Sequence, residues 1–333
     1  MTDRHRPPTI LIVTHGNDNG SVGLVMEAVA ERGGIAYRFD SDRFPTDIQL
    51  GSRYRGGEEH VSLSCDAYEL DLETVSAVWY RRIAIGHRIP AAMDPQLRRA
   101  AIEQTEATVQ GMIASLDGFH LDPAHCVQRA ENKQLQLKIA RELGLEIPRT
   151  VITNEPETVR HLAQQCPQGI VTKPLRPFAI RERGAHKVVY TNAIEAEELE
   201  HLAGLRYCPA IFQERVPKAL ELRTTIVGDR VFTASIDSQR SERAQTDWRR
   251  ECLELIDEWE PYALPSVVED RMLRLMRRLG LHYGAADFIL TPDGRHVFLE
   301  INPAGEFFWL EKYAGLPLSG EIAALLISKR LGA

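Results

Sequence analysis

Three residues near the C-terminal end of the chain carry side-chain oxygens that could bind a metal ion, namely Asp287, Glu300 and Asn302. They lie among β-branched and aromatic residues, where carboxylates are hard to explain as part of a solvated surface. Carboxylate and amide oxygens suit Mg²⁺ better than zinc or copper. Because Mg²⁺ usually lies between a few carboxylates and the phosphates of a substrate, such a site implies a nucleotide. The alternative is an ordinary charged hairpin without a metal.

A predicted β-hairpin over residues 284–302 brings these oxygens together. The Asp-Gly dipeptide at 293–294 is favoured in two-residue hairpin loops. With that loop, Asp287 lies opposite Glu300, where like charges repel unless a cation relieves them. Asn302 shares the face of Glu300 because side chains alternate along a strand. The other face is apolar and is predicted to be the core face, with Ala286, Phe288, Leu290, Val297, Leu299 and Ile301.

Two lysines and a pair of arginines could bind anions. Lys133 lies in the first turn of a predicted helix over residues 131–143, although cations are favoured at the opposite end of a helix, so its side chain could reach an anion. Lys173 lies inside a short predicted strand, and lysine is rarely buried unless it is paired. Arg81 and Arg82 directly follow a predicted strand and could grip a substrate carboxylate. The alternative for each of these cations is a solvated position on the surface.

An α/β fold is predicted from the order of the elements in the N-terminal third. Residues 9–13 form an apolar strand, a loop and a helix capped by Ser21 follow, and a second strand covers 35–39. This β-loop-α-β unit favours a parallel sheet. A hairpin is predicted over residues 47–70, with its turn at Gly56-Gly57. Further predicted elements are strands over 75–80, 169–175, 211–217, 220–227 and 230–235, a long helix that begins at Asp94-Pro95, and a helix over 266–279.

The composition is that of an ordinary globular protein. The chain has 333 residues, of which 44% are hydrophobic and 26% charged, enough for two or three domains. The net charge is −7, so no general attraction to nucleic acid or to an anionic membrane is expected. No apolar run approaches the ~20 residues of a membrane span. The five scattered cysteines lack CxxC spacing, which favours a reducing cytoplasm over disulfides or a zinc site.

Several of these residues stand in an order that resembles the ATP-grasp fold. They are Lys133, Lys173, Gln213-Glu214, Glu221, Asp287, Glu300 and Asn302. The resemblance covers most of the chain and implies two α+β subdomains that hold ATP between them, after an N-terminal Rossmann-like pre-ATP-grasp domain. It implies a division into residues 1–123, 124–208 and 209–333.

The same resemblance implies ligands for each part of ATP. Lys133 and Lys173 would contact the phosphates, Glu221 would bind the ribose, and the acidic hairpin would bind two Mg²⁺ ions. The hinge between the subdomains would hold the adenine. The hinge residues expected there are Gln213, Glu214 and Val216.

Longer motifs resemble the microviridin-type, or graspetide, peptide macrocyclases across the whole chain. They are RFDSDRFPT (38–46), AVWYRR (77–82), GMIASLDGFHLDP (111–123), NKQLQL (132–137), FQERVPKALELR (212–223), DWR (247–249) and LEINPAGEFFWLE (299–311). Such enzymes activate a side-chain carboxylate of a ribosomal precursor peptide as an acyl phosphate. A Thr or Ser hydroxyl then closes an ester, or a Lys amine closes an amide, and the motifs look closest to the ester-forming members. The implied cofactors are ATP and Mg²⁺, and the implied partner is the precursor peptide with its leader and core.

This resemblance also implies residues that bind the peptide. Arg223 and Arg249 are candidates for holding the acceptor carboxylate and the developing acyl phosphate, since a planar guanidinium suits both. An acidic helix over residues 195–202 would dock a basic helical leader, and a solvated acidic face is the alternative. The helix residues expected to contact the leader are Glu197, Glu198 and His201.

Two other functions fit part of the pattern. Another ATP-grasp carboxylate–amine ligase, such as one that adds glutamate or makes a dipeptide, would share the nucleotide site, and product analysis would distinguish it. A nucleotide-binding module without catalysis is disfavoured by the complete set Asp287, Glu300 and Asn302. A homodimer is compatible with the sequence.

Overall fold

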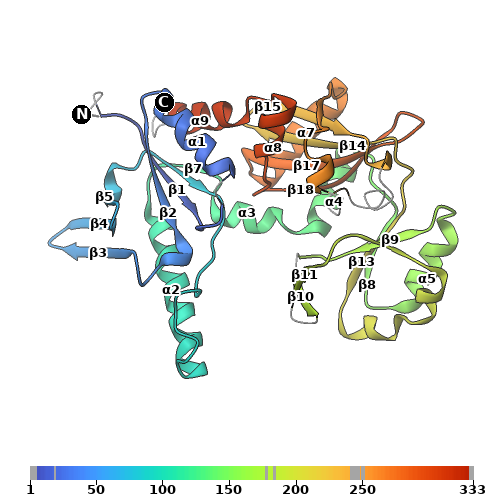
Figure 1. Ribbon diagram of the computed structural model, residues 1–333, viewed down its shortest axis with the longest axis horizontal. Coiled ribbons are helices and arrows are strands. Elements are labelled where there is room, and N and C mark those ends of the chain that lie inside the picture. The colour runs from blue at the N-terminus through green and yellow to red at the C-terminus, as the bar shows by residue number, and fades with distance from the viewer. Residues whose placement is uncertain are drawn as a thin grey trace. The chain divides into compact units, whose positions relative to one another are not determined.

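The computed structural model describes residues 6–18, 20–176, 179–182, 185–240, 248 and 252–329. The chain forms two compact units, whose elements Figure 1 colours by residue number. The first unit comprises the residues up to Cys126, with Glu306–Phe308 and the residues from Pro317 onwards. The second comprises Val127–Gly305 and Trp309–Leu316. The finer division into three domains at residues 123 and 208 stays a prediction.

A parallel four-stranded sheet of order β2-β1-β6-β7 forms the centre of the first unit. Its strands are β1 (Thr9–Thr14), β2 (Ile35–Asp40), β6 (Ala77–Tyr80) and β7 (Phe119–Leu121). The apolar run of β1, Ile10 to Val13, is fully buried, as is typical of a parallel strand covered on both faces. Helices α1 (Gly20–Glu31) and α9 (Leu318–Ser328) lie side by side. The predicted parallel β-loop-α-β unit is confirmed.

The long helix α2 (Pro95–Ser115) begins where the sequence predicts. The Asp94 carboxylate accepts hydrogen bonds from the backbone N–H groups of Gln96 at 3.0 Å and Leu97 at 3.2 Å. Pro95 occupies the first helical position, where its missing N–H is not needed. Shorter elements of this part of the chain are η1 (Ser41–Arg43), η2 (Leu72–Thr74) and α3 (Ala124–Ala130).

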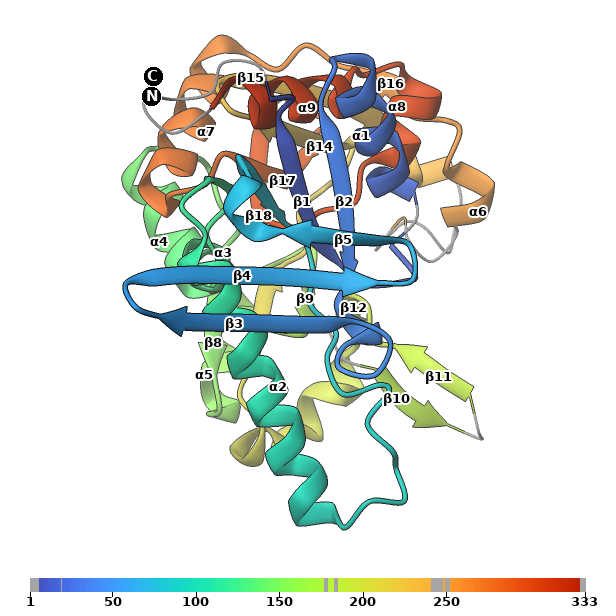
Figure 2. The ribbon, with the colours of Figure 1, turned by 90° about the vertical axis from the view of Figure 1, so that its left-hand side faces the viewer.

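Residues 47–70 form three strands where the sequence predicted two. They are β3 (Gln49–Arg55), β4 (Glu58–Cys65) and β5 (Tyr68–Asp71), which pair antiparallel in that order. Figure 2 shows these strands in blue, lying side by side. The predicted turn is correct, since Gly56 and Gly57 both have positive φ. The second turn, between Cys65 and Tyr68, has no glycine and gave no signal in the sequence.

The prediction that Ser21 caps the first helix is wrong. Helix α1 begins at Gly20, so Ser21 lies inside the first turn and is buried. Its hydroxyl donates to a carboxylate oxygen of Glu306 rather than accepting from the helix backbone. The serine therefore joins the helix to a residue near the other end of the chain.

Arg81 and Arg82 neither project into solvent nor stand ready for a substrate carboxylate. The Arg81 side chain is buried, with Nε 3.1 Å from Asp18 Oδ2 and Nη2 donating to Glu306 Oε2 at 2.6 Å. Arg82 lies 3.5 Å from both carboxylates. Burial works to raise the pKa of Asp18, but the Arg81 guanidinium and the Thr14 hydroxyl outweigh it, and the pKa is lowered. Both predicted alternatives are thus replaced by internal ion pairs.

The second unit contains an antiparallel sheet of order β12-β9-β13-β8. Its strands are β8 (Thr150–Thr153), β9 (Ile170–Lys173), β12 (Asn192–Ile194) and β13 (Ala210–Glu214). Helix α5 (Pro156–Gln165) packs on it through Val159 and Leu162, which are buried with Ile170 and Phe212. A separate hairpin of β10 (Ala179–Glu182) and β11 (Ala185–Val188) follows β9, and helix α4 (Lys133–Glu142) precedes the sheet.

The predicted acidic α-helix over 195–202 is instead a pair of 3₁₀ helices. They are η3 (Ala196–Glu200) and η4 (Leu202–Tyr207). Glu195 caps η3, and the carboxylate of Glu198 accepts from the Glu195 backbone N–H at 2.8 Å. Glu197, Glu198 and His201 are all exposed.

A five-stranded antiparallel sheet of order β16-β15-β14-β17-β18 completes the second unit. Its strands are β14 (Leu220–Val227), β15 (Arg230–Ile236), β16 (Glu260–Pro261), β17 (Tyr283–Leu290) and β18 (His296–Asn302). Helix α7 (Ser266–Leu279) covers the range that the sequence predicts and runs alongside this sheet (Figure 1). The remaining elements are η5 (Ser238–Arg240), α6 (Cys252–Leu255) and α8 (Phe308–Ala314). In the part of the chain that the structure describes, no helix combines the length and hydrophobicity needed to cross a membrane.

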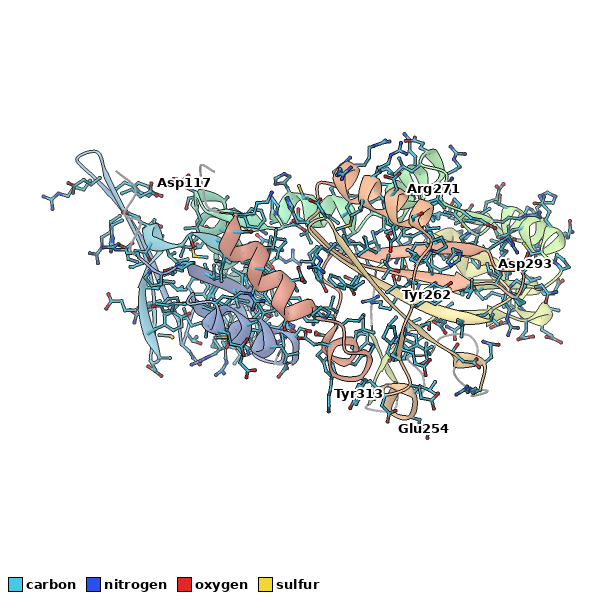
Figure 3. All side chains as sticks on the ribbon, turned by 90° about the horizontal axis from the view of Figure 1, so that it is seen from above. Asp117, Glu254, Tyr262, Arg271, Asp293 and Tyr313 are labelled. Carbon is cyan, nitrogen blue, oxygen red and sulfur yellow. The ribbon has the colours of Figure 1, made fainter. Side chains whose placement is uncertain are left out.

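The hairpin of β17 and β18 pairs Asp287 with Glu300 as predicted, but by a different route. The Thr291 backbone N–H donates to the Arg295 carbonyl at 3.0 Å, so the loop has three residues, including Asp293, which is labelled in Figure 3. A β-bulge after Asp287 then leaves Leu299 without a partner and restores the predicted register beyond it.

The same bulge changes the faces on the turn side of the hairpin. Phe298 lies opposite Phe288 and is fully buried, although the sequence assigned it to the polar face. Val297 lies opposite Ile289 and packs with it and with Val216. The predicted core face is therefore correct for Ala286, Phe288 and Ile301, and wrong for Val297 and Leu299.

Candidate active site

One face of the five-stranded sheet presents three rows of facing side chains. Cross-strand partners in an antiparallel sheet point to the same side, so the register of β14, β17 and β18 defines each row. The rows are Glu221–Ile289–Val297, Arg223–Asp287–Glu300 and Thr225–Ala285–Asn302. The middle row alone consists of charged residues. It is flanked by a largely apolar row on one side and by a small, polar row on the other.

Three cations neutralise the two carboxylates of the charged row. Arg223 Nη1 donates to Asp287 Oδ1 at 2.8 Å from the neighbouring strand. Lys173, at the end of β9, lies with Nζ 3.3 Å from Glu300 Oε2. Lys133, at the start of α4, donates to the same oxygen. The two lysines that the sequence singled out separately therefore meet at one predicted metal ligand.

Lys173 is the more deeply buried of the two lysines. Its side chain is only 11% exposed. Burial lowers its pKa, and the nearby Lys133 adds to this, while the Glu300 carboxylate opposes both. A buried ammonium needs an anion beside it, so Lys173 can exchange Glu300 only for another negative group such as a phosphate.

The row that begins at Glu221 has the character of a nucleoside site. Val216, Ile289 and Val297 are buried together, with Leu299 packed against them. Glu221 closes this apolar surface at one end. Its Oε1 accepts from Lys218 Nζ at 2.7 Å and from Ser238 Oγ at 2.7 Å. The sequence reasoning missed Lys218 and Ser238, although Lys218 lies three residues before Glu221 in the same motif.

Two of the predicted hinge residues have side chains that are already engaged. Gln213 is buried, and its Nε2 donates to Thr150 Oγ1 at 3.0 Å. Glu214 Oε2 lies 3.7 Å from Arg149 Nε. An adenine at this hinge would therefore meet the backbone of the segment and the side chain of Val216.

Asn302 is exposed and lies in the third row, which is next to the charged row. Its Oδ1 accepts from the Ala304 backbone N–H at 2.9 Å, which fixes the start of the following loop. That loop needs glycine at position 305, because a Cβ there would lie 2.5 Å from the Ala285 Cβ and 2.7 Å from Arg223 Nη2. The Tyr283 hydroxyl donates to the Gly305 carbonyl at 2.6 Å. Gly305 thus lets the loop lie directly against the Arg223 guanidinium.

Gln136 is a further residue at the site that the sequence reasoning missed. It is buried on α4 and its amide hydrogen-bonds to the backbone of Ile301, between Glu300 and Asn302. A polar residue within the apolar stripe of a helix was the available signal. Arg249, the other predicted peptide ligand, lies outside the described residues.

Comparisons with known proteins agree with this arrangement. Residues 9–128 match the family model described as the MvdD pre-ATP grasp domain. A search of curated proteins found no match. Among solved structures, the macrocyclase MdnC bound with precursor peptide MdnA, from Microcystis aeruginosa MRC, is 47% identical, with a TM-score of 0.87 over 96% of this chain and 99% of that chain.

Two further solved structures are similar over nearly their whole length. A RiPP-associated ATP-grasp ligase from Chryseobacterium gregarium, in complex with ADP and a leader and core peptide, is 38% identical, with a TM-score of 0.92 over 97% of each chain. The macrocyclase MdnB from Microcystis aeruginosa MRC is 35% identical, with a TM-score of 0.82 over 96% of this chain and 99% of that chain. The fold and the charged row define an ATP-grasp ligase. Within that class, the chain belongs to the family of microviridin-type peptide macrocyclases.

Proposed function

We propose that this protein uses ATP to close rings in a ribosomally made precursor peptide. It activates Asp or Glu side chains of the core as acyl phosphates, which Thr or Ser hydroxyls attack to form ω-esters. The observation that carries the proposal is the row Arg223–Asp287–Glu300, whose two facing carboxylates are surrounded by Arg223, Lys133 and Lys173. MdnC, 47% identical, is bound with a precursor peptide, which supports the class of substrate.

The donor set of the charged row fits Mg²⁺. Asp287 and Glu300 are directly opposed, and Asn302 adds an amide oxygen two residues further along β18. When bound, Mg²⁺ would neutralise charge on the phosphates and polarise the transferring group. The cations that now hold the carboxylates would then be available to the nucleotide. We propose that Lys133 and Lys173 turn from Glu300 to the phosphates.

The remaining residues position the nucleotide and the peptide. Val216 and the apolar row would cover the adenine, and Glu221, oriented by Lys218 and Ser238, would accept from the ribose hydroxyls. Gln213 and Glu214 would contribute the hinge backbone. Arg223 lies between the row of Glu221 and the row of Asn302, where its guanidinium would hold the acceptor carboxylate and the developing acyl phosphate. Arg249 is proposed to share this role on the grounds of the DWR motif.

The reaction balances without a redox partner. A core carboxylate oxygen attacks the γ-phosphorus of ATP, which breaks the bond to ADP and forms the mixed anhydride. A Thr or Ser hydroxyl then attacks the acyl carbon, loses its proton and expels inorganic phosphate. Each ring thus consumes one ATP and removes the elements of one water from the peptide.

Alanine variants of the two lysines should bind ATP more weakly. Each would lose a charge-assisted contact worth about 1.5–3 kcal/mol, or roughly a 10- to 100-fold weaker affinity. Calorimetry with ATP measures this for Lys133→Ala and Lys173→Ala. Lys138→Ala, an exposed lysine on the same helix, serves as the control and should bind as the wild type does. Unchanged affinity in both site variants would refute the phosphate assignment.

We further propose that Glu197, Glu198 and His201 dock a basic helical leader segment. All three are exposed on consecutive 3₁₀ turns. Because Glu198 also closes a capping box with Glu195, Glu197 is the cleaner position to change.

Charge reversal at Glu197 should weaken leader binding, and added salt should weaken it in the wild type. Fluorescence anisotropy of a labelled MdnA leader peptide measures both effects. Glu59→Lys, an exposed glutamate on β4, is the matched control. If the affinity for the leader changes neither with the charge reversal nor with added salt, an electrostatic leader site is contradicted.

The cysteines and the net charge bear on the location and the assembly of the protein. We place the protein in the cytoplasm, because the cysteine pattern suits a reducing compartment and Cys65, Cys126, Cys166 and Cys208 are free thiols. A homodimer stays a proposal, and the negative charge gives no reason to expect a nucleic-acid or membrane partner.

The ester assignment is tested by mass spectrometry of the modified precursor before and after mild alkali. MdnA, the precursor peptide bound by MdnC, is the substrate to use. We expect the loss of one water per ring, and its return after alkali, because esters hydrolyse readily. Rings that survive alkali would be amides and would overturn the ester assignment.

A further inference from the structure

The strand that carries two of the three proposed metal ligands lies at the edge of its sheet. Strand β18 bears Glu300 and Asn302, pairs with β17 on one side and has an isolated bridge to Glu146 at Val297 on the other. An edge strand leaves half of its backbone groups without ladder partners. The bulge at Leu299 also interrupts its pairing directly before Glu300. The ligand-bearing end of β18 therefore needs support from outside the sheet.

The Gln136 amide supplies that support at the residue between the two ligands. Its Nε2 donates to the Ile301 carbonyl at 2.8 Å, and its Oε1 accepts from the Ile301 backbone N–H at 3.0 Å. The same Nε2 atom also donates its other hydrogen to the Ala130 carbonyl at 2.6 Å. The side chain is 2% exposed, so water cannot replace these bonds. A flipped amide would set its oxygen against two carbonyls, which fixes the orientation.

The helix that carries Gln136 also carries a phosphate-ligand candidate. Lys133 lies three residues before Gln136 on α4, so both side chains point to nearly the same side of the helix. Gln136 therefore links the helix that carries Lys133 to the strand that carries Glu300. A second link, from the Phe298 N–H to the Glu146 carbonyl at 2.8 Å, lies on the other side of the bulge from Glu300 and Asn302.

We propose that Gln136 is a positioning residue for the metal site: by pairing with both backbone groups of Ile301, it holds Glu300 and Asn302 in register with Lys133. This inference rests on the proposed function, because it assumes that Glu300 and Asn302 bind the metal. Groups that orient metal ligands typically change metal affinity 10- to 100-fold when they are replaced. The role differs from general packing, since an apolar residue of the same size fills the space and makes none of the three bonds.

The test measures metal binding directly. Electron paramagnetic resonance counts free Mn²⁺ in titrations of the protein with saturating AMPPNP. The variant is Gln136→Met, which keeps the volume. Two controls accompany it: Gln134→Met, an exposed glutamine on the same helix, and Val159→Ala, a destabilising change in the separate core under α5. We expect the Mn²⁺ dissociation constant to rise 10- to 100-fold in Gln136→Met and to stay within about twofold in both controls.

Turnover gives a second readout. Raising Mg²⁺ should restore most of the kcat of Gln136→Met and none of the loss in Val159→Ala. If Gln136→Met does not fold, Gln136→Glu takes its place, because it keeps the acceptor for the Ile301 N–H and loses both donors. An unchanged Mn²⁺ dissociation constant in the folded variant would overturn the inference and leave the proposed function intact. Absence of Mn²⁺ binding by the wild type with AMPPNP would overturn the metal site itself.

Discussion

Asp287→Asn and Glu300→Gln should each abolish ring formation while the fold survives. Each change keeps the shape of the side chain and removes one of the two opposed negative charges that would bind Mg²⁺. Loss of metal-assisted charge stabilisation is worth several kcal/mol, which corresponds to a fall in kcat of roughly 10²–10³-fold or more. The effect should be larger for Glu300, because two lysines would then face each other without their shared carboxylate.

The measurement is the rate of precursor dehydration across a Mg²⁺ titration, with thermal unfolding as a check on folding. Asp293→Asn provides a matched control, because this aspartate lies in the turn of the same hairpin and forms an ion pair with Arg295 there. Its activity should equal that of the wild type. Near-normal activity of both site variants at limiting Mg²⁺ would contradict the assignment of Asp287 and Glu300 as metal ligands.

Arg223→Lys should reduce kcat far more than it weakens ATP binding. The side chain is 11% exposed, its guanidinium is fixed by Asp287 at 2.8 Å and lies against Gly305, so its N–H groups have a defined direction. Lysine keeps the charge but cannot donate two parallel hydrogen bonds to a carboxylate or an acyl phosphate. Loss of one such contact to a developing charge typically lowers the rate ~10²–10³-fold.

Steady-state kinetics with separate ATP and peptide titrations distinguishes this role from a structural one. We expect the KM for ATP to change by no more than a few-fold in Arg223→Lys. Arg230→Lys, an exposed position at the turn end of β15, is the control. A large loss of ATP affinity with kcat preserved would move Arg223 from the acceptor side of the site to the nucleotide.

The sequence was informative wherever a local pattern determined the outcome. The parallel unit over β1 and β2, the capped helix α2 and the range of α7 follow from short-range periodicity and capping. The pairing of Asp287 with Glu300 was correct although the turn was one residue longer, because the bulge at Leu299 compensates for it. A buried apolar face and a polar face constrain register more strongly than the turn does.

The errors concern contacts between residues far apart in the chain. No local pattern reveals that Arg81 pairs with Glu306, or that Gln136 pairs with the backbone of Ile301. The sequence also could not predict that residues 196–207 form 3₁₀ rather than α-helices, since both kinds of helix share the same capping residues. The convergence of Lys133 and Lys173 on Glu300 depends on three separate elements and became visible only in the fold.

The most direct test of the acyl-phosphate reaction follows oxygen from the peptide to phosphate. A precursor whose Asp and Glu side-chain carboxylates carry ¹⁸O is incubated with the enzyme, Mg²⁺ and ATP, and the phosphate is analysed by ³¹P nuclear magnetic resonance. We expect ADP and one ¹⁸O-containing inorganic phosphate for each water lost from the peptide, because the bridging oxygen of the anhydride leaves with the phosphate. Unlabelled phosphate, or AMP with pyrophosphate, accompanying ring formation would contradict the mechanism.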